Sequence, residues 1–214
     1  MLVAAGRGER LEQGRPKALV EVGRRPLLAW ALDTVRAAGI DDRDIVVVGP
    51  AGQLDQVRRY VGGCAAVAGG DSRQASVAAG LEAMPAGVDA VLVHDAARCL
   101  TPAAVFARVL AALEQGSHGV VPTLPVTDTL RHLGGAMVDR ADLVAVQTPQ
   151  GFARPALERA HADGAVWATD DATLVERLGG VEITLVPGSE EAFKVTRPID
   201  LLLAGAVLAA RTAS

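Results

Sequence analysis

The chain has 214 residues, of which 50% are apolar and 3% aromatic, a composition that predicts one substantial core packed mainly by Ala, Val and Leu. Lys and Arg together number 21 and Asp and Glu 25, giving a net charge of −4, so no overall positive field would attract a nucleic acid or a membrane surface. A phosphate ligand would need a local cluster of cations.

From the N-terminus, short apolar runs alternate with amphipathic stretches. Pro26 and Pro102 suit the first turn of a helix, and Asp71 with Ser72 suits a helix cap. The alternation predicts an α/β fold with a mostly parallel sheet and helices on both faces. The expected strands are 2–5, 45–48, 64–67, 91–94 and 119–122, and the expected helices between them are 26–38, 53–61, 71–84 and 101–114.

The pattern changes after residue 125. Residues 126–140 read as two strands around Gly134 and Gly135, which indicates a hairpin. Because a lone two-stranded hairpin is marginally stable in water, this arm is expected to pack on something, a second copy of the chain being the natural partner. Residues 147–152 read as a loop, and the remaining elements are helices 154–164, 170–178 and 198–211 with strands 182–186 and 192–195.

The ends of the chain and its cysteines bear on location. The longest apolar run, residues 201–210, has half the length of a membrane span, so it predicts a buried terminal helix. No signal peptide is visible before the first glycine-rich loop. Cys64 and Cys99 match no metal-binding spacing and are interpreted as reduced, half-buried thiols of a cytoplasmic protein.

The first candidate site is the stretch AAGRGER…PK, residues 4–17. It lacks the third glycine of a dinucleotide fingerprint, and Ala18 stands where a P-loop has Ser or Thr. Gly6 and Gly8 would let backbone N–H groups approach an anion, and Arg10 and Lys17 add full charges. Connections between a strand and a helix usually run about 2–6 residues, so the length of this loop favours phosphate binding over a plain connection with surface cations.

Other motifs are less specific. GGDSRQAS at 69–76 could place anionic groups at a helix N-terminus or be an ordinary capped helix, which is the favoured interpretation of this motif alone. In HDAAR at 94–98, Asp95 could bind hydroxyl groups or a hydrated cation and Arg98 a phosphate, or the two could form a local ion pair. TDDA at 169–172 reads first as a helix cap. His118, His132 and His161 show no ligand spacing and are interpreted as surface or packing residues.

The use of lysine is unusual. Of the 21 basic residues 19 are Arg, there is no Asn, and the only lysines are Lys17 and Lys194. One hypothesis is that coding bias has removed lysine wherever arginine could replace its compact ammonium group. The alternative is chance.

Taken together and in this order, eight motifs resemble one family: AAGRGER…PK, GGDSRQASV, VHDAAR, PVTDTL, VDR, QTPQGF, TDDA and KVTRPIDL are similar to 2-C-methyl-D-erythritol 4-phosphate cytidylyltransferase. The resemblance covers residues 3 to about 202. It implies a single-domain Rossmann-like nucleotidyltransferase fold over 1–214, with a protruding β-arm at about 126–142 used for dimerisation.

The resemblance also implies the reaction and the partners. The family transfers CMP from CTP to 2-C-methyl-D-erythritol 4-phosphate, releasing pyrophosphate, with Mg²⁺ or another divalent cation, in the non-mevalonate route to isoprenoids. The acceptor phosphate attacks the α-phosphorus in line without a covalent intermediate. Neither nucleic acid nor membrane is an expected partner.

By motif position the resemblance assigns roles to individual residues. Arg10 and Lys17 would steady the α-phosphate, Lys194 would position both phosphates, and Arg140 would reach the neighbour's site. The expected nucleotide contacts are Ala4, Ala5, Gly6, Gly70, Asp71, Arg73 and Ser76. The expected contacts to the methylerythritol phosphate are Asp95, Arg98, Thr129, Thr148 and Thr169.

This chain departs from the family pattern in three places. Only three residues precede AAG where the family has a longer strand ending in Pro, Cys99 stands where Pro usually follows DAAR, and Ala192-Phe193 replaces Asn-Ile before Lys194. A ribitol-5-phosphate cytidylyltransferase shares the glycine loop, but AAG and DAAR favour methylerythritol phosphate over the AGG and DSVR of that rival. A non-catalytic nucleotide-binding homologue is the other alternative, and intact Arg10, Lys17 and Lys194 argue against it.

Overall fold

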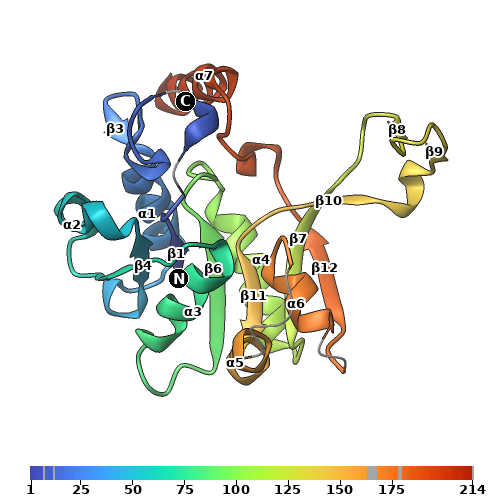
Figure 1. Cartoon of the computed structure of the whole chain (residues 1–214), viewed down its shortest axis with the longest axis horizontal. Helices are drawn as coiled ribbons and strands as arrows, with labels where there is room; N and C mark the ends of the chain where they lie inside the picture. The colour runs from blue at the N-terminus through green and yellow to red at the C-terminus, as the bar shows by residue number, and fades with distance from the viewer. Residues whose placement is uncertain (7, 12, 163–167, 178–179, 214) are drawn as a thin grey trace.

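The computed structural model describes residues 1–6, 8–11, 13–162, 168–177 and 180–213. At its centre is an eight-stranded sheet with helices on both faces (Figure 1). The strands of this sheet are β1 Leu2–Val3, β4 Val46–Gly49, β5 Ala65–Ala68, β6 Ala90–Asp95, β7 Gly119–Pro125, β10 Val144–Val146, β11 Gln150–Ala153 and β12 Ile183–Pro187.

Parallel pairing runs through one half of the sheet in the order β5–β4–β1–β6. In this register Leu2 of β1 pairs with Val47 of β4 and with His94 of β6. β11 lies antiparallel between β6 and β7, β10 pairs antiparallel with β7, and β12 joins β7 in parallel. The mostly parallel α/β sheet predicted from the sequence is confirmed.

Helices cover the sheet in two sets, each with its own buried cluster. The helices are α1 Leu27–Ala37, α2 Leu54–Val61, α3 Arg73–Glu82, α4 Ala103–Glu114, α5 Arg154–Ala162, α6 Asp171–Arg177 and α7 Pro198–Ala213. One cluster contains Leu32 of α1 and Phe106 of α4, together with side chains of α2. The other contains Val77 of α3 and Leu157 of α5, together with side chains of α6.

The central strands supply both clusters because successive side chains of a strand point to opposite faces. Val47 of β4 packs in the cluster of α1 and α4, whereas Val46 and Val48 pack in the cluster of α3 and α5. All three are at most 1% exposed, and each such side chain contributes about 1.5–3 kcal/mol by leaving water. The β-branched run therefore forms a strand buried on both faces, as predicted.

Three segments differ from the prediction. Residues 192–195 were expected to form a strand, but Glu190–Ala192 is a 3-10 helix and Val195 instead donates its N–H to Ala97 O (2.8 Å). The loop expected at 147–152 becomes strand β11 from residue 150 onward. The terminal helix α7 is not buried throughout: Ala204 is fully buried, but Leu202 is 71% exposed, because α7 covers only the edge of the molecule beside β2 Glu21–Val22 (Figure 1).

Gly151 lies within β11 and provides a test of the fold. A Cβ at this position would lie 2.5 Å from Val109 Cγ1 and 2.8 Å from Leu113 Cδ1, so a poor strand former is needed where α4 presses on the sheet. Gly151→Ala is expected to lower the free energy of unfolding by about 1–3 kcal/mol, measured by urea denaturation. The matched control is Gly205→Ala in α7, where no atom lies within 4 Å and where a gain of about 0.5–1 kcal/mol is expected. Equal urea midpoints for Gly151→Ala and the wild type would contradict this packing.

The hairpin predicted after residue 125 is present as a two-stranded arm, β8 Leu130–Arg131 and β9 Met137–Val138. Gly135 adopts a φ of +94° in the turn, and its N–H donates to His132 O (2.8 Å). The arm projects from the body (Figure 1). Leu133 is fully exposed and Met137 is 68% exposed, so the arm presents apolar surface that nothing in the described chain covers.

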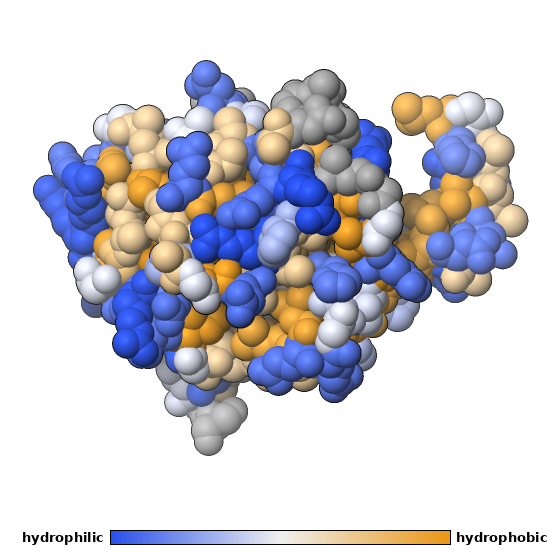
Figure 2. Space-filling model, turned by 90° about the horizontal axis from the view of Figure 1, so that it is seen from below, coloured by the Kyte–Doolittle hydropathy of each residue, from blue (hydrophilic) through white to orange (hydrophobic). Residues whose placement is uncertain are grey.

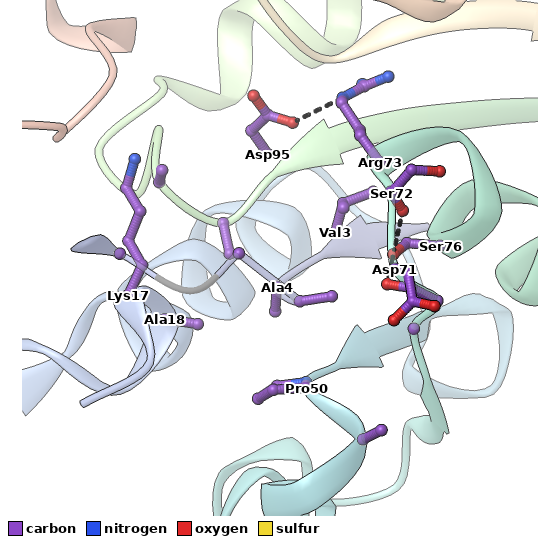
Figure 3. A pocket seen from close by; sticks show the side chains of 18 of the residues that line it. Val3, Ala4, Lys17, Ala18, Pro50, Asp71, Ser72, Arg73, Ser76 and Asp95 are labelled. Atoms are coloured by element: carbon purple, nitrogen blue, oxygen red, sulfur yellow. Dashed lines mark hydrogen bonds and ion pairs between the residues drawn. The ribbon is translucent and has the colours of Figure 1, made fainter. Parts of the chain in front are cut away.

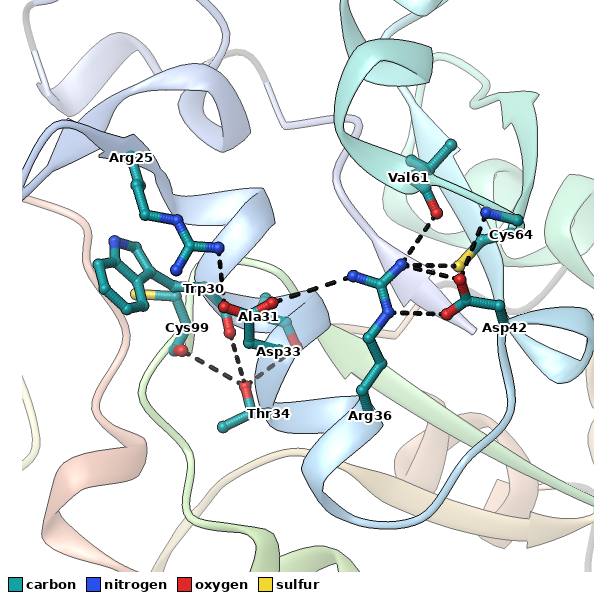
Figure 4. A network of polar contacts seen from close by, with 11 residues as sticks. Arg25, Trp30, Ala31, Asp33, Thr34, Arg36, Asp42, Val61, Cys64 and Cys99 are labelled. Carbon is teal, nitrogen blue, oxygen red and sulfur yellow. Dashed lines mark hydrogen bonds and ion pairs between the residues drawn. The ribbon is translucent and has the colours of Figure 1, made fainter.

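Arg36 ties α1 to the end of α2 (Figure 4). Its guanidinium donates to both carboxylate oxygens of Asp42 (2.7 and 3.0 Å) and to Val61 O (3.1 Å), and it lies 3.8 Å from Cys64 Sγ. These bonds hold the pKa of Asp42 below its ordinary value.

A two-stranded ribbon of β2 and β3 Arg25–Pro26 was not predicted from the sequence. The guanidinium carbon of Arg25 in this ribbon lies 4.3 Å from the centre of the Trp30 ring.

In the part of the chain that the structure describes, no helix combines the length and apolar character needed to cross a membrane.

Candidate active site

A cleft of about 780 Å³ opens where the chain leaves the carboxyl ends of β1, β4, β5 and β6, which is where parallel sheets place their ligands. The loop after β1 forms one wall and the start of α3 the other, with Asp95 between them (Figure 3). Eleven of the sixteen residues expected at the site line this cleft: Ala4, Ala5, Gly6, Arg10, Lys17, Gly70, Asp71, Arg73, Ser76, Asp95 and Lys194.

The loop after β1 is closed by its own backbone. The N–H of Lys17 donates to Gly6 O (3.2 Å), and the N–H of Leu11 donates to Gly8 O (2.9 Å). Leu11 is 0% exposed and anchors the loop in the core, while Gly8, with φ +76°, lies so close to Lys17 that a Cβ would come within 2.9 Å of its backbone. The loop therefore brings Arg10 and Lys17 into the same cleft.

The opposite wall is a glycine turn followed by a capped helix. Ser72 Oγ accepts from Ala75 N–H (3.0 Å) as the N-cap of α3, and Ser76 Oγ donates to Ser72 O (2.8 Å). A Cβ at Gly69 would lie 2.6 Å from Ala5 Cβ, and one at Gly70 would lie 2.6 Å from Ala75 Cβ. Both glycines are therefore needed to bring the first turn of α3 against the strand end.

Asp95, the last residue of β6, organises the charges between the two walls. Its Oδ2 lies 2.6 Å from Lys194 Nζ, and its Oδ1 lies 3.6 Å from Arg73 Nε. Burial acts to raise the pKa of this carboxyl, but the Lys194 and Arg73 charges outweigh burial and hold the pKa well below its ordinary value. Asp95 is thus ionised at neutral pH and fixes a cation on each side.

Lys17 is a desolvated cation among other cations. Burial, reinforced by the charges of Lys194 and Arg10 and opposed by Asp95, lowers the pKa of its ammonium to about 8. The cleft therefore holds more positive charge than its own carboxylates balance. An anionic ligand would supply the missing negative charge.

The segment carrying Lys194 is fixed on both sides. Before it, the Gln147 side chain donates to Ser189 O (2.8 Å) and accepts from Ser189 N–H (3.0 Å). After it, Asp200 Oδ2 accepts from the N–H (2.7 Å) and hydroxyl (2.9 Å) of Thr196. Burial opposes these bonds but does not prevent them from lowering the pKa of Asp200. Sequence reasoning missed Gln147 and Thr196, although Thr196 lines the cleft and stands within the KVTRPID motif.

Arg98 and Thr148 lie behind the cleft rather than in it. The Arg98 guanidinium donates to Ala192 O (2.7 Å) and Val146 O (3.2 Å), and burial lowers its pKa. Thr148 is buried, with its Oγ1 accepting from Asp95 N–H (3.1 Å) and lying 3.0 Å from His94 Nδ1. In this chain Thr148 thus supports the backbone of Asp95, and Arg98 supports the segment that carries Lys194.

The three other expected residues do not reach this cleft. Thr129 and Arg140 are exposed on the arm, where the Arg140 guanidinium donates to Thr127 O. Thr169, just before α6, is also exposed. These residues do not line the cleft of the chain to which they belong.

Comparisons with known proteins agree on one family. A family model described as 2-C-methyl-D-erythritol 4-phosphate cytidylyltransferase matches residues 1–210. The chain is 45% identical over 230 residues to a protein of that name from Streptomyces avermitilis, covering 99% of this chain and 91% of that protein. It is 48% identical to the bifunctional enzyme IspD/IspF of Clavibacter michiganensis, covering 94% of this chain but spanning only 52%, about half, of that enzyme.

Solved structures give the same result for the fold. The crystal structure of 2-C-methyl-D-erythritol 4-phosphate cytidylyltransferase from Thermus thermophilus has a TM-score of 0.82 and 41% identity, covering 96% of both chains. A synthase of 4-diphosphocytidyl-2C-methyl-D-erythritol from Anaerococcus prevotii has a TM-score of 0.84 at 25% identity, covering 97% of this chain and 95% of that one. These relatives favour methylerythritol phosphate over the ribitol phosphate alternative.

Proposed function

The chain belongs to the 2-C-methyl-D-erythritol 4-phosphate cytidylyltransferase family, and from this premise we propose that its cleft transfers CMP from CTP to 2-C-methyl-D-erythritol 4-phosphate. The observation that carries the proposal is the convergence of Arg10, Lys17 and Lys194 on one cleft at the strand ends. The two lysines, the only ones in the chain, come from its opposite ends. That placement favours retention for phosphate contact over chance.

The reaction needs charge and positioning more than a nucleophile from the protein. An oxygen of the acceptor phosphate forms a bond to the α-phosphorus of CTP as the bond to pyrophosphate breaks, and the electron pair leaves with pyrophosphate. The acceptor phosphate is already ionised, so no general base is required. Arg10 and Lys17 would stabilise the charge that builds on the α-phosphate, and Lys194, fixed by Asp95, would hold the two phosphates in line.

The nucleotide would lie against the two glycine-rich walls. Backbone groups of residues 4–6 and of residues 70–73, which lead into α3, offer N–H donors and close approach to base, ribose and phosphates. Asp71 contributes an exposed carboxylate for hydroxyl groups. The Ser76 hydroxyl already donates to Ser72 O, so Ser76 would act by shaping this wall.

A divalent cation fits this donor set only if the substrate supplies most of its ligands. The described residues contain no group of three or more His, Cys, Asp or Glu side chains that could hold a metal ion. Of the two carboxylates that line the cleft, Asp95 is already paired with Lys194 and Arg73, which leaves Asp71. Asp71 would therefore be the protein carboxylate available to a Mg²⁺ ion held mainly by the triphosphate, whose charge such an ion would partly neutralise.

A second copy of the chain would complete the site. Thr129 and Arg140 lie on the arm, away from their own cleft, and the arm stands apart from the body with apolar and charged side chains at its surface (Figure 2). An arm that crosses to a partner would bury Leu133 and Met137 and bring Arg140 to the partner's cleft. A homodimer with shared sites is therefore part of the proposal.

We place the reaction in the cytoplasm. Cys64 and Cys99 are both free and buried, and burial raises the pKa of Cys64 to about 11 and that of Cys99 to about 12. Protonated, unpaired thiols are suited to a reducing compartment.

The proposed function is tested by pyrophosphate release with CTP and Mg²⁺, comparing 2-C-methyl-D-erythritol 4-phosphate with ribitol 5-phosphate. Turnover with the first substrate alone is expected. A preference for ribitol 5-phosphate would retain the mechanism but assign the protein to another pathway. Absence of release with either substrate, from a folded protein that binds CTP, would support a non-catalytic role.

Gly8 offers a test of the loop that holds Lys17. Gly8→Ala would push a methyl group against the Lys17 backbone, and a displacement of that size is expected to lower kcat about 10²-fold. Gly14→Ala is the matched control, because Gly14 also has a positive φ (+62°) but has no atom within 4 Å of a new Cβ. Its kcat should stay within about threefold of the wild type, since it adds backbone strain without the collision. Equal losses in both variants would show that strain alone is responsible.

The pH dependence should report on Lys17. Because its pKa is lowered to about 8, the ammonium is charged below pH 8 and neutral above, so kcat/KM for CTP is expected to fall about tenfold per pH unit above pH 8. In Lys17→Arg the residual activity should not fall in this range, because arginine keeps its proton. The same decline in that variant would assign the titration to another group.

A further inference from the structure

Behind the cleft, a row of charged side chains continues into the protein interior. Asp95 lies beside Arg73, whose guanidinium nitrogen Nη1 lies 2.7 Å from Asp171 Oδ2. The second oxygen of Asp171 lies 3.0 Å from Nε2 of His161 in α5. From the interior outward the order is thus His161, Asp171, Arg73, Asp95 and Lys194.

The inner end of this row is buried and its outer end, Lys194, is the most exposed, with Asp95 beside it only 10% exposed. The Asp171 side chain is 0% exposed and that of His161 3%, compared with 27% for Arg73 and 40% for Lys194. No hydrogen bond within the described residues satisfies Asp171 Oδ2, so the ion pair with Arg73 is what balances its charge. The row connects a fully buried carboxylate to a cation of the cleft.

Helix capping does not account for Asp171. The preceding residue, Asp170, caps α6, because its Oδ1 accepts from Thr173 N–H (3.1 Å) and its Oδ2 accepts from Gln150 Nε2 (2.8 Å). Gln150 Oε1 in turn accepts from Ala172 N–H (3.2 Å). A buried ion pair is also no better for stability than apolar side chains of similar size. Asp171 thus needs another reason for carrying a charge at this position.

We propose that Asp171 is a positioning residue for nucleotidyl transfer, acting through Arg73 on Asp95 and Lys194; this inference rests on the proposed function. Asp171 lies 2.7 Å from Nη1 of Arg73, whereas the contact of Arg73 with Asp95, through Nε, is longer, at 3.6 Å. Asp95 is therefore left to form its short contact of 2.6 Å with Lys194. Arg73 lies beside Asp95 (Figure 3), close enough to balance the charge of this carboxylate. It does not replace Lys194, which keeps the shorter contact.

Without the Asp171 charge, Arg73 would turn its planar fork onto Asp95, since arginine favours two parallel bonds to one carboxylate. Lys194 would then lose the partner that fixes its ammonium. Because Lys194 serves the reacting phosphates, the loss would affect the transition state more than the binding of cytosine and ribose. The effect should therefore fall on kcat and leave KM for CTP nearly unchanged.

The test compares Asp171→Asn with Asp170→Asn. Both remove one carboxylate charge from the same turn, but only Asp171 contacts Arg73. After wild-type turnover is established, kcat for Asp171→Asn is expected to fall roughly 10- to 100-fold with KM for CTP within about threefold. Asp170→Asn should retain kcat within about threefold, because asparagine also caps helices. A kcat for Asp171→Asn within twofold of the wild type would overturn the proposal.

A double-mutant cycle tests whether Asp171 acts through Arg73. In an Arg73→Gln background, adding Asp171→Asn should cost no further activity and should raise the melting temperature, because it removes a buried carboxylate left without its cation. An equal loss of kcat in both backgrounds, or a melting temperature that does not rise, would refute the coupling. The melting temperatures need no substrate, so they test the coupling of Asp171 to Arg73 even if the wild type shows no turnover. Absence of turnover in the wild type would instead reject the proposed function.

Discussion

Lys17→Met is expected to reduce turnover by about 10²–10³-fold or more, the loss seen when one preorganised donor to a developing charge is removed. The same substitution is expected to raise the melting temperature. The reason for this gain in stability is electrostatic. Lys17 is desolvated beside Lys194 and Arg10, which lowers its pKa to about 8.

The sign of the stability effect follows from that pKa. The pKa of a lysine in the unfolded chain is about 10.4, so the folded protein binds the proton of Lys17 more weakly than the unfolded chain does. Below pH 8 both states carry this proton, and the weaker binding lowers the free energy of unfolding. The cost is present in full below pH 8 and is relieved as pH rises toward the unfolded value. The stability advantage of Lys17→Met over the wild type should therefore be largest at pH 7 and shrink between pH 8 and pH 10.

Arg15→Met provides the matched control for Lys17→Met. Arg15 is a cation of the same loop, but it is exposed and lies 3.9 Å from Glu21, outside the cleft. Its replacement should leave turnover within about twofold and the melting temperature nearly unchanged, as expected for a weak surface pair. If Lys17→Met lost activity and stability together, the loss would be structural, and near-normal turnover would refute the role of the loop.

The sequence predicted the cleft well because its residues follow a rule that needs no tertiary detail. Residues just beyond the carboxyl ends of parallel strands meet at one edge of the sheet. Lys17 follows β1 and Asp95 ends β6, so the β/α alternation alone was enough to predict that they lie close together. The glycines at 8, 69 and 70 could also be recognised without tertiary detail. A glycine has no Cβ, so the residue type itself indicates that the backbone can approach another group closely.

Other features depend on packing that local patterns do not record. Residues 147–152 read as a loop around Pro149, yet β11 begins at residue 150, and its Gly151 lies where α4 leaves no room for a side chain. Asp170 and Asp171 are identical in type, and only the direction of α6 decides that one caps the helix while the other enters the interior. The sequence also did not predict which side of α7 stays exposed. Burial of a helix face depends on elements that are distant in sequence, and these cover Ala204 but not Leu202.

The shared site of the proposed dimer can be tested by complementation. Arg140→Ala should lower turnover strongly because its guanidinium would reach the partner's cleft, and Lys17→Ala should be inactive in its own cleft. In a hybrid dimer of these two variants, the cleft with an intact Lys17 receives the intact Arg140, and the other cleft has neither. One site in two would be active in each hybrid, and random exchange of equal amounts makes about half of the dimers hybrids, so activity should return to roughly a quarter of the wild type.

This recovery distinguishes a shared site from an arm that acts on its own subunit. If Arg140 served the cleft of its own chain, every hybrid site would carry one damaged residue, and mixing would restore nothing. Exchange is confirmed by mass-tagging one variant, and the control mixes Arg140→Ala with Arg140→Ala/Lys17→Ala, which offers no intact arm. Exchange without recovery would reject the shared site, whereas recovery in the first mixture alone would place Arg140, exposed in the isolated chain, in the neighbouring cleft.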